Sequence, residues 1–464
     1  TPPSPKAKSA IEDPVEWPLA NKWQRMKVGQ IVYQYIKEGR GTIQVYMSYT
    51  LASPLTWPEG RSLAVDVMKD EKLIPFHVCS DVVYSETAHY ADMIIPDATY
   101  MERWGFDTRN NMELRDYVTL RQPIVEPPAE CVSFADSLIE IAKRVSPDTA
   151  KYFAFKNHEE WIKLRCAALG KTIGGDGFAY MVKHGVWQDM SKPKYYDLFN
   201  WELKPDEIKD TRVDEATQRI YRKAADGKET LAGIMANGKA RRGFITPSRK
   251  FSIYHEDIEA AAKECGFTED GGKGMPAYFP VPSIEKMTPD MLHLVTFKWN
   301  VHTQGRTASQ KYLTEIVHHN PMWINADTAA KFGIKTGDMV EITTYRAYGH
   351  AMKNGGDVLG TALIPAYVTE GIHPKVLAVS NSLGNMWHGR AATATNGKKM
   401  KQAIPAWNTN IIQEDPDLDE DIWWDPAKGG TGAGYNINAI LPIQTAPLVG
   451  MQGWYDTVCT IRRV

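Results

Sequence analysis

Apolar positions in the first third of the chain follow two different periodicities. Residues 21–39 and 62–73 carry apolar side chains at helical spacing, whereas 42–54, 74–84 and 86–96 contain short apolar runs typical of strands. Strands that alternate with helices predict a parallel sheet covered on both faces. In such a sheet ligands bind beyond the carboxyl ends of the strands, so we expect the polar side chains at one strand end, within Cys79-Ser80-Asp81, to contact a ligand.

The rest of the chain changes character twice. Residues 133–145 have helical spacing and are followed by Pro147, and 150–290 are more polar and helical in patches. From Met291, short β-branched segments separated by Gly and Pro predict a closed β-barrel, in which only 327–334 is clearly helical. The predicted fold class is therefore α/β, with a parallel-sheet domain, a mixed helical region and a C-terminal barrel. The predicted boundaries are 1–40 for a linker and helix, 41–150 for the α/β domain, 151–290 for the mixed helical region and 291–464 for the barrel.

The composition of the chain limits the kinds of partner that we expect it to bind. The chain of 464 residues has a formal net charge of −2, which gives no reason to expect nucleic acid. An apolar run of about 18 residues is missing from the sequence, so a transmembrane helix is not expected. The first residues also lack the basic start and apolar stretch of a secretory signal.

The metal-ligating residue types are widely spaced. The five cysteines form no CxxC or CxxxC pair, so we expect no iron–sulfur cluster or structural zinc in this chain and interpret all five as buried thiols. The adjacent His318 and His319 would not share one face of a helix, and a third ligand is not visible nearby. The prediction is therefore that this chain supplies no metal ligand.

Four segments carry motifs, in this order: SDVVYSETAHYADMIIPD with YMERWG (80–105), GFITPSRKF (243–251), TFKWNVHTQGRT (296–307), and NINA (436–439) continuing to GWYDT (453–457). Together they resemble the molybdopterin oxidoreductases of the dimethyl sulfoxide reductase superfamily. In this family the second segment reads TPSGK, so that Arg249 replaces the usual glycine. Details such as YMERWG and RQPIVEPP are most similar to the polysulfide, thiosulfate and arsenate reductase branch.

The resemblance implies a cofactor and a barrel type. The cofactor is bis(molybdopterin guanine dinucleotide) with molybdenum or tungsten, and the barrel is six-stranded and of the double-psi type. In the family, the protein ligand of the metal and the cysteines of a 4Fe–4S cluster lie in the N-terminal half of the catalytic subunit, before the first of these motifs. We therefore expect that half as a partner of this chain, together with a ferredoxin-like iron–sulfur subunit, and with a membrane anchor subunit, on the periplasmic side of the membrane.

The activity implied is that of an enzyme. It would move an oxygen or sulfur atom, or an electron pair, to or from a small inorganic sulfur or arsenic species. Two alternatives stay open from the sequence: chemistry of the formate dehydrogenase type, and a non-catalytic scaffold that keeps the fold within a respiratory complex.

The first segment offers candidate contacts to the dinucleotide. A carboxylate accepts two N–H groups from a guanine edge, so the resemblance implies Asp81 as a guanine contact, with Ser80 beside it. Arg103 matches a family position with a basic cofactor contact and would bind the diphosphate. The alternative interpretations are a turn Asp for Asp81 and an exposed helix charge for Arg103.

The third segment is a loop with hydroxyls, an amide and backbone N–H groups that glycine leaves accessible. This composition suits a pterin or a phosphate, although a plain turn is the alternative. The residues expected to contact the cofactor are Lys298, His302, Thr303, Gln304 and Thr307.

The last part of the chain adds two more groups. Asn438, and after it Asn436, are the amides expected on the cofactor, or else turn residues. In the family the loop that contains His388 and Arg390 faces the substrate funnel, where both side chains would attract an oxyanion, with a solvated loop as the alternative.

Overall fold

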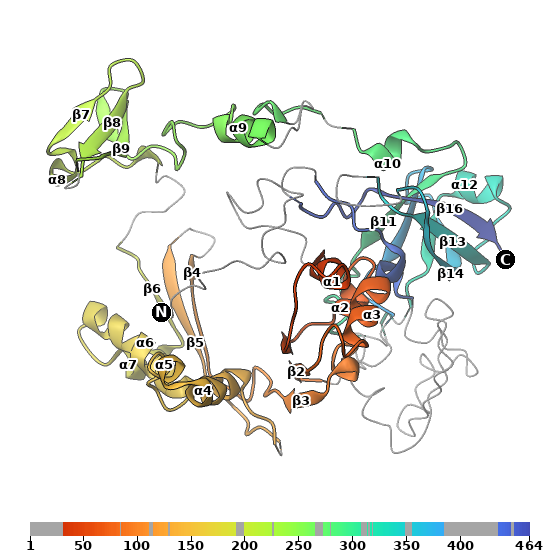
Figure 1. The fold of residues 1–464 in the computed structure, drawn as a ribbon, viewed down its shortest axis with the longest axis horizontal. Helices are drawn as coiled ribbons and strands as arrows, with labels where there is room; N and C mark the ends of the chain where they lie inside the picture. Colours follow the sequence, from red (N-terminus) through yellow and green to blue (C-terminus); the bar gives the residue numbers. More distant parts are fainter. Residues whose placement is uncertain are drawn as a thin grey trace. The chain divides into compact units, whose positions relative to one another are not determined.

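The chain forms two compact units in a computed structural model (Figure 1). The middle unit consists chiefly of residues 98–260 and 269–277, and the barrel unit chiefly of 31–97 and 278–464. The described residues are 31–464 without 84, 111–114, 129, 192–198, 225–226, 265–271, 279, 308–312, 314–315, 318, 349–354, 385–434 and 447–449.

The barrel unit begins with a parallel sheet, as the sequence predicted. Its strands are β1 (Tyr46–Tyr49), β2 (His77–Asp81) and β3 (Met93–Pro96), with β2 in the middle. One face is covered by α1 (Ile31–Lys37), η2 (Arg61–Val65) and α3 (Asp66–Met68), whose apolar side chains form one core. The position of β2 between two parallel neighbours brings Ser80 and Asp81 to the carboxyl edge of the sheet.

The barrel follows the predicted alternation of buried and exposed side chains. Along β11 and β13 every second residue is buried, the pattern of a strand with one face in a core. Six strands of the described chain close in the order β11-β15-β12-β14-β13-β16, and β15 runs parallel to β11. Their bounds are β11 (Leu292–Phe297), β12 (Met322–Ile324), β13 (Met339–Tyr345), β14 (Val358–Val368), β15 (Val376–Ser380) and β16 (Thr457–Arg463).

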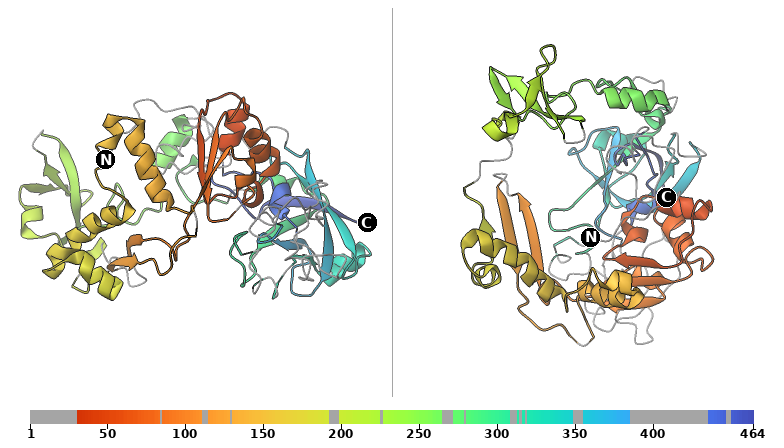
Figure 2. Two further views of the ribbon diagram at one scale, coloured as in Figure 1. Left: turned by 90° about the horizontal axis from the view of Figure 1, so that it is seen from below. Right: turned by 60° about the vertical axis from the view of Figure 1, so that its left-hand side comes forward.

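Short helices flank the barrel. The predicted helix is α12 (Ala326–Lys331), where the Asn325 side chain caps the N-terminus by accepting the backbone N–H of Asp327. The others are α2 (Ser53–Thr56), η3 (Ala88–Tyr90), α10 (Pro282–Glu285) and η8 (Ile437–Ile440). Figures 1 and 2 show α1–α3 beside the barrel strands in every view.

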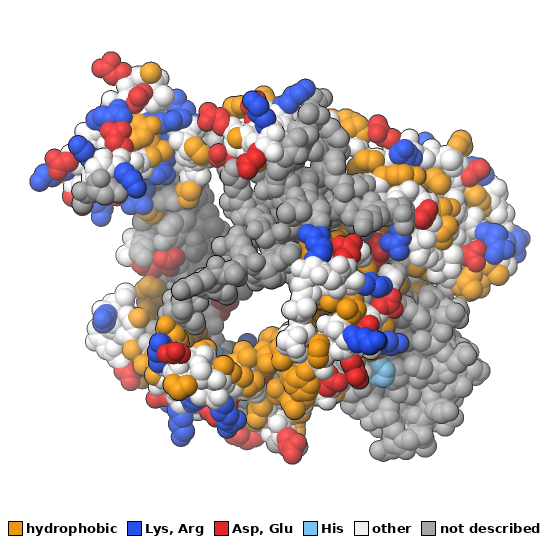
Figure 3. Space-filling model, in the orientation of Figure 1, with side chains coloured by type: hydrophobic (Ala, Val, Ile, Leu, Met, Phe, Trp, Pro, Cys, Tyr) orange, Lys and Arg blue, Asp and Glu red, His pale blue; other side chains and the backbone are white. Residues whose placement is uncertain are grey.

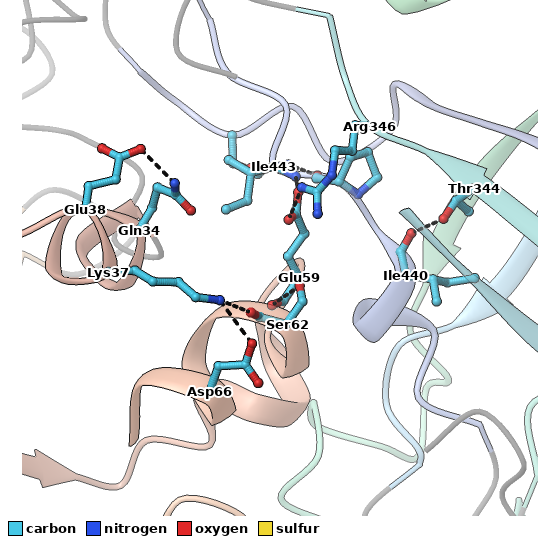
Figure 4. Close-up of polar contacts among 12 residues, drawn as sticks. Gln34, Lys37, Glu38, Glu59, Ser62, Asp66, Thr344, Arg346, Ile440 and Ile443 are labelled. Carbon is cyan, nitrogen blue, oxygen red and sulfur yellow. Dashed lines mark hydrogen bonds and ion pairs between the residues drawn. The ribbon is translucent and has the colours of Figure 1, made fainter. Parts of the chain in front are cut away.

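A buried carboxylate joins the α/β layer to the barrel (Figure 4). Glu59, only 1% exposed, accepts hydrogen bonds from Arg346 Nη1 at 2.8 Å and from the backbone N–H of Ile443 at 3.1 Å. Its own backbone N–H donates to the carbonyl of Leu441 at 3.0 Å. Ile443 also packs in the core of the α/β layer, so polar and apolar contacts fix the same junction.

In one part of the middle unit, helices pack against a small antiparallel sheet. The strands β4 (Gly105–Asn110), β5 (Asp116–Arg121) and β6 (Val186–Gln188) are antiparallel. Leu120 of β5 packs with Ile162, Cys166 and Met181 of the helices in one core. The helices are α4 (Phe134–Val145), α5 (Pro147–Ala150), α6 (His158–Ile173) and α7 (Gly177–His184).

The middle unit also contains a second sheet that the sequence analysis did not expect. Its antiparallel strands are β7 (Thr211–Val213), β8 (Arg219–Lys223), β9 (Glu229–Ala236) and β10 (Lys239–Arg241), near α8 (Pro205–Ile208). In β8 only Ile220 is buried, so the apolar alternation that reveals a strand is missing. Arg and Lys obscure the alternation in β8, and β9 is a short apolar run that does not distinguish a strand from a buried helix, so the region was wrongly interpreted as mixed helical.

Two remaining observations concern helices. The helix α9 (Glu256–Glu264) begins with three acidic residues, which suit the positive end of a helix dipole. Within the part of the chain that the structure describes, no helix combines the length and the apolar character that crossing a bilayer requires.

We predict that replacing Arg346 by Ala lowers the free energy of unfolding by about 3 kcal/mol, because it leaves the carboxylate of Glu59 buried without its counter-ion. Thermal or denaturant unfolding checks this. The matched control is Lys37→Ala, which removes an exposed ion pair to Asp66 and should cost under about 1 kcal/mol. If the two substitutions lowered the free energy of unfolding equally, the ion pair of Glu59 and Arg346 would not stabilise the junction more than an exposed ion pair does.

Candidate functional site

The carboxyl end of β2 carries polar atoms without protein partners. Ser80 is fully buried, and its Oγ has no hydrogen-bond partner among the described residues. Thr87 is also fully buried, and its Oγ1 likewise has no hydrogen-bond partner among the described residues. Asp81 is half-buried, and its Oδ1 accepts the backbone N–H of Val82 at 2.8 Å. A buried hydroxyl without a partner costs free energy, so these positions fit a polar ligand.

The backbone around Asp81 is held on both sides. The Ser80 carbonyl accepts from the N–H of Thr50, and the Asp81 carbonyl accepts from the N–H of Asp97 at 3.0 Å. On the covered face of the sheet, Ser48 Oγ and His77 Nε2 are 2.9 Å apart. The strand end is therefore rigid, and the side chain of Asp81 projects from a fixed support.

A buried amide holds the second part of the site at the barrel. Asn320 is fully buried and donates from Nδ2 to the carbonyls of Ser380 at 2.6 Å and Tyr435 at 2.8 Å. Its Oδ1 accepts the backbone N–H of Tyr435 at 2.7 Å. Asn320 thereby fixes the end of β15 next to the segment that carries Asn436. This role of Asn320 was not predicted from the sequence.

Four more buried polar atoms have no hydrogen-bond partner within the described part of the chain: Trp299 Nε1, Asn381 Oδ1, Ser382 Oγ and Asn436 Nδ2. The segments after β11 and β15 are adjacent, because the Asn381 N–H donates to the Phe297 carbonyl at 3.0 Å. Asn381 and Ser382 directly follow β15, and the ring of Trp299, two residues after β11, packs on Phe297 and Trp323. These strand ends and the residue before η8 thus offer two donors and two groups able to accept.

The close approach of two of these segments requires a glycine. Gly384 has φ +100°, and a Cβ there would lie 2.2 Å from the backbone N of Asn436. A larger residue would push these segments apart. The predicted contact Asn436 is 1% exposed and Asn438 is 3% exposed, both at the start of η8.

The predicted loop after β11 is built around His302. This side chain is 4% exposed; its Nε2 donates to the Val317 carbonyl at 2.6 Å, and its Nδ1 lies 3.0 Å from Thr307 Oγ1. Thr307 Oγ1 also accepts the N–H of Thr303 at 3.0 Å. Both ring nitrogens are thus used inside the protein, so His302 and Thr307 shape the loop, and direct cofactor contact by either residue stays a prediction.

The other loop candidates are more accessible. Gln304 is half-buried and has a positive φ of 52°, whereas Lys298 and Thr303 are exposed. These side chains can meet a ligand without moving the barrel, and their contact with the cofactor stays a prediction.

Both parts of the site belong to the barrel unit. The chain leaving β1 at its carboxyl end enters α2, and α2 packs against η8, in which Asn438 lies. Tyr33 Oη lies 3.1 Å from Ser53 Oγ at the start of α2. The sheet edge that carries Ser80 and Asp81 is therefore connected through α2 to the segment that carries the two asparagines.

The remaining predicted residues lie elsewhere. Arg103 is in the middle unit, where burial lowers the pKa of His158 and the charges of Arg103 and Arg121 act in the same direction, against Asp136. Its role as a diphosphate contact stays a prediction. The predicted substrate residues His388 and Arg390 lie outside the described residues.

The described thiols are buried or half-buried, and burial keeps two of them protonated when no metal is bound. Burial raises the pKa of the Cys79 thiol to about 11, and burial also raises the pKa of Cys459. A metal binds the thiolate rather than the thiol. The described cysteines Cys79, Cys131, Cys166 and Cys459 are free, and the described residues contain no group of three or more His, Cys, Asp or Glu that could hold a metal ion.

The donor set fits a pterin dinucleotide better than a bare metal. Buried hydroxyl, amide and indole groups without partners suit a ligand rich in ring nitrogens, carbonyl oxygens and phosphates. The motifs predicted Ser80, Asp81 and Asn436 as cofactor contacts, whereas four other residues with such atoms were not singled out from the sequence, although two of them lie in the loop expected to face the pterin and the substrate funnel. These are Thr87, Trp299, Asn381 and Ser382. What identifies them is an unsatisfied polar atom, which a sequence does not display.

Family comparisons match both parts of the site. Residues 292–454 match the family "Molydopterin dinucleotide binding domain", which includes most of the barrel and its rim. Residues 60–144 match the family "Molybdopterin oxidoreductase", which includes β2 and Asp81.

Curated relatives are reductase subunits by name. The thiosulfate reductase molybdopterin-containing subunit of Salmonella typhimurium is 25% identical over 82% of this chain and 45% of its own length. A selenate reductase subunit of Mesobacillus selenatarsenatis is 23% identical over 75% of this chain and 35% of its own length. The arsenate respiratory reductase molybdopterin-containing subunit of Chrysiogenes arsenatis is 23% identical over 70% of this chain and 38% of its own length. The chain thus spans less than half the length of each.

Among solved structures, acetylene hydratase from Pelobacter acetylenicus shares the fold, with a TM-score of 0.57 at 14% identity over 98% of this chain and 50% of that chain. The two domain matches follow the order that the motifs predicted. The chain therefore belongs to the dimethyl sulfoxide reductase superfamily of molybdopterin oxidoreductases, whose cofactor is a metal-carrying molybdopterin dinucleotide.

Proposed function

We propose that this chain is the dinucleotide-binding part of the catalytic subunit of an oxidoreductase that acts on a small inorganic sulfur or arsenic species. The observation that carries the proposal is the set of buried polar atoms that have no partner among the described residues, near the end of a barrel that matches the dinucleotide-binding family. Protein interiors satisfy such groups, so a bound ligand accounts for them.

The proposed cofactor is bis(molybdopterin guanine dinucleotide) with molybdenum or tungsten. When bound, its metal supplies the redox chemistry by which an atom or an electron pair is transferred. The proposal places the metal-ligating side chain and a 4Fe–4S cluster in the N-terminal half of the same catalytic subunit. We also propose that the barrel is of the double-psi type. The proposed domains are the α/β domain at 41–150, the mixed region at 151–290 and the barrel at 291–464.

The chain's own residues would bind and orient this cofactor. Asp81 would accept N–H groups of one guanine, with Ser80 and Thr87 offering hydroxyls nearby. At the barrel rim Trp299 and Asn436 would donate hydrogen bonds, and Asn381 would accept one. Each unsatisfied group would gain a hydrogen bond, which favours retention of the ligand.

The substrate class rests on the relatives. Their names specify thiosulfate, selenate and arsenate reductases, and all three substrates are small inorganic oxyanions. We propose an anion of this class, approaching past His388 and Arg390. The proposed partners are a ferredoxin-like iron–sulfur subunit, and with it a membrane anchor subunit, on the periplasmic side of the membrane.

We predict about one molybdenum or tungsten per protein after anaerobic purification of the complete catalytic subunit, because the metal enters with the pterin. Metal analysis by mass spectrometry measures this. Oxidation of a reduced viologen dye with thiosulfate, tetrathionate or arsenate then measures the activity. Absence of both metals would favour the scaffold alternative, and activity with formate alone would favour the formate dehydrogenase type.

Asp81→Ala should weaken retention of the guanine dinucleotide at least about tenfold, since hydrogen bonds to a charged group contribute about 1.5–3 kcal/mol. The guanine nucleotide released by acid hydrolysis, per mole of protein, measures it. Asp66→Ala is the control, because Asp66 makes an exposed ion pair on α3. An unchanged guanine content in Asp81→Ala would refute the assignment.

Asn320→Ala should reduce cofactor content and increase amide hydrogen exchange at 380–384 and 435–440. Three buried backbone groups lose their partners, at about 1–3 kcal/mol each. Asn325→Ala is the control: it removes another buried amide from the barrel unit, which caps α12 and donates to the Ile372 carbonyl, and should cost about 1–3 kcal/mol for each lost partner without loss of cofactor. Normal cofactor content in Asn320→Ala would show that the rim does not need this anchor.

A further inference from the structure

The middle unit contains a cavity of about 360 Å³ that the proposed function does not use. This volume is within the range of small-molecule sites. The cavity lies between α8, β9 and the loop after β10, and Figure 3 shows basic and acidic side chains mixed over the β7–β9 sheet. The lining residues are Leu203, Glu207, Ala232, Arg242, Gly243, Ile245 and Arg249.

Arg249 occupies a backbone position that favours glycine. Its φ is +61°, in the left-handed region that side chains with a Cβ enter at a cost in free energy. It stands where the family's TPSGK pattern has glycine. Gly243 lies against it: a Cβ on Gly243 would be 2.5 Å from the Arg249 carbonyl oxygen. The turn is closed by the N–H of Phe244, which donates to the Arg249 carbonyl at 2.9 Å.

The guanidinium of Arg249 is only partly used by the protein. Nη2 donates to the Leu231 carbonyl at 2.8 Å. Nε is buried and has no hydrogen-bond partner among the described residues. An arginine that accepts an unfavourable φ and keeps an unused buried donor beside a cavity fits the binding of an anion, because a guanidinium offers a planar set of donors.

A second arginine lines the same cavity. Arg242 Nη2 lies 3.2 Å from Glu207 Oε1, and its Cζ is 5.7 Å from the ring centroid of Trp201. Arg222 donates to the backbone carbonyl of Glu207. Two guanidinium groups, of Arg242 and Arg249, and one carboxylate, of Glu207, therefore line this cavity, so its lining carries a net positive charge even with Glu207 ionised.

The cavity walls distinguish between anions. Leu203 and Ala232 form the apolar wall, and their contact with a fully hydrated inorganic ion would be unfavourable. Ile245 also lines the cavity, but it is 85% exposed. We propose that this cavity binds a carboxylate with a short apolar body, whose oxygens meet Arg249 and Arg242 and whose hydrocarbon part lies on the apolar wall. Such a carboxylate occurs both on a free organic acid and at the C-terminus of a peptide. The proposed contacts to the two arginines and to the apolar wall are the same for both. This site is independent of the dinucleotide site.

Titration calorimetry of the purified protein tests the proposal. The probes are sodium hexanoate, 1-hexanol, sodium sulfate, and the tripeptide Ala-Ala-Leu with a free or an amidated C-terminus. We expect binding of hexanoate, of the free-acid tripeptide, or of both, which also identifies the source. Hexanol, sulfate and the amidated peptide should bind at least tenfold more weakly. Failure of both carboxylates to bind, or equal binding of hexanol or sulfate, would overturn the proposal.

Arg249→Gly is the decisive variant, because glycine adopts positive φ freely and the turn should fold at least as well. We expect carboxylate binding to fall at least tenfold while the melting temperature stays the same or rises. Arg212→Gln is the matched control, since Arg212 on β7 pairs with Glu229 and does not line the cavity. Unchanged binding in Arg249→Gly, in a protein that melts normally, would show that Arg249 only braces the loop.

Discussion

The barrel unit depends on one buried carboxylate. Glu59 is almost inaccessible to solvent, and it is stable there because Arg346 and the N–H of Ile443 both donate to it. Charges in an interior are tolerated only when paired and hydrogen-bonded, so this geometry leaves the α/β layer little freedom against the barrel. Through it, the strand end with Asp81 and the rim with Asn436 become parts of one rigid support. Glu59 has a positive φ of 51°, which is another sign that the chain bends sharply to make this contact.

The polar groups of the site divide into two kinds. Asn320 and His302 satisfy their hydrogen bonds within the protein and therefore shape the site. Trp299, Asn381 and Asn436 carry buried polar atoms at the rim that lack partners among the described residues. This contrast separates support from binding surface on physical grounds, because a complete protein–ligand complex should leave few buried polar groups unsatisfied.

Much of the fold could be predicted from the sequence, and less of the site. The alternating burial along β11 and β13 is visible as a period of two, and the run that forms β2 led directly to Ser80 and Asp81. The sheet of β7–β10 could not be predicted, because Arg and Lys obscure the alternation in β8 and the apolar run of β9 has no clear period of two. Asn320 and Trp299 could not be ranked either, since hydrogen-bond satisfaction depends on partners that lie far away in the sequence, such as Tyr435 for Asn320.

The parallel pairing of β11 with β15 has a consequence for how this kind of site diversifies. Parallel neighbours end at the same rim, so the chain leaves both strands on one side of the barrel while the hydrogen bonds between them stay intact. Insertions or exchanges in the loop after either strand can therefore alter ligand preference without breaking barrel closure. Homologous barrels can in this way acquire new specificities by loop variation alone, with the strands inherited unchanged.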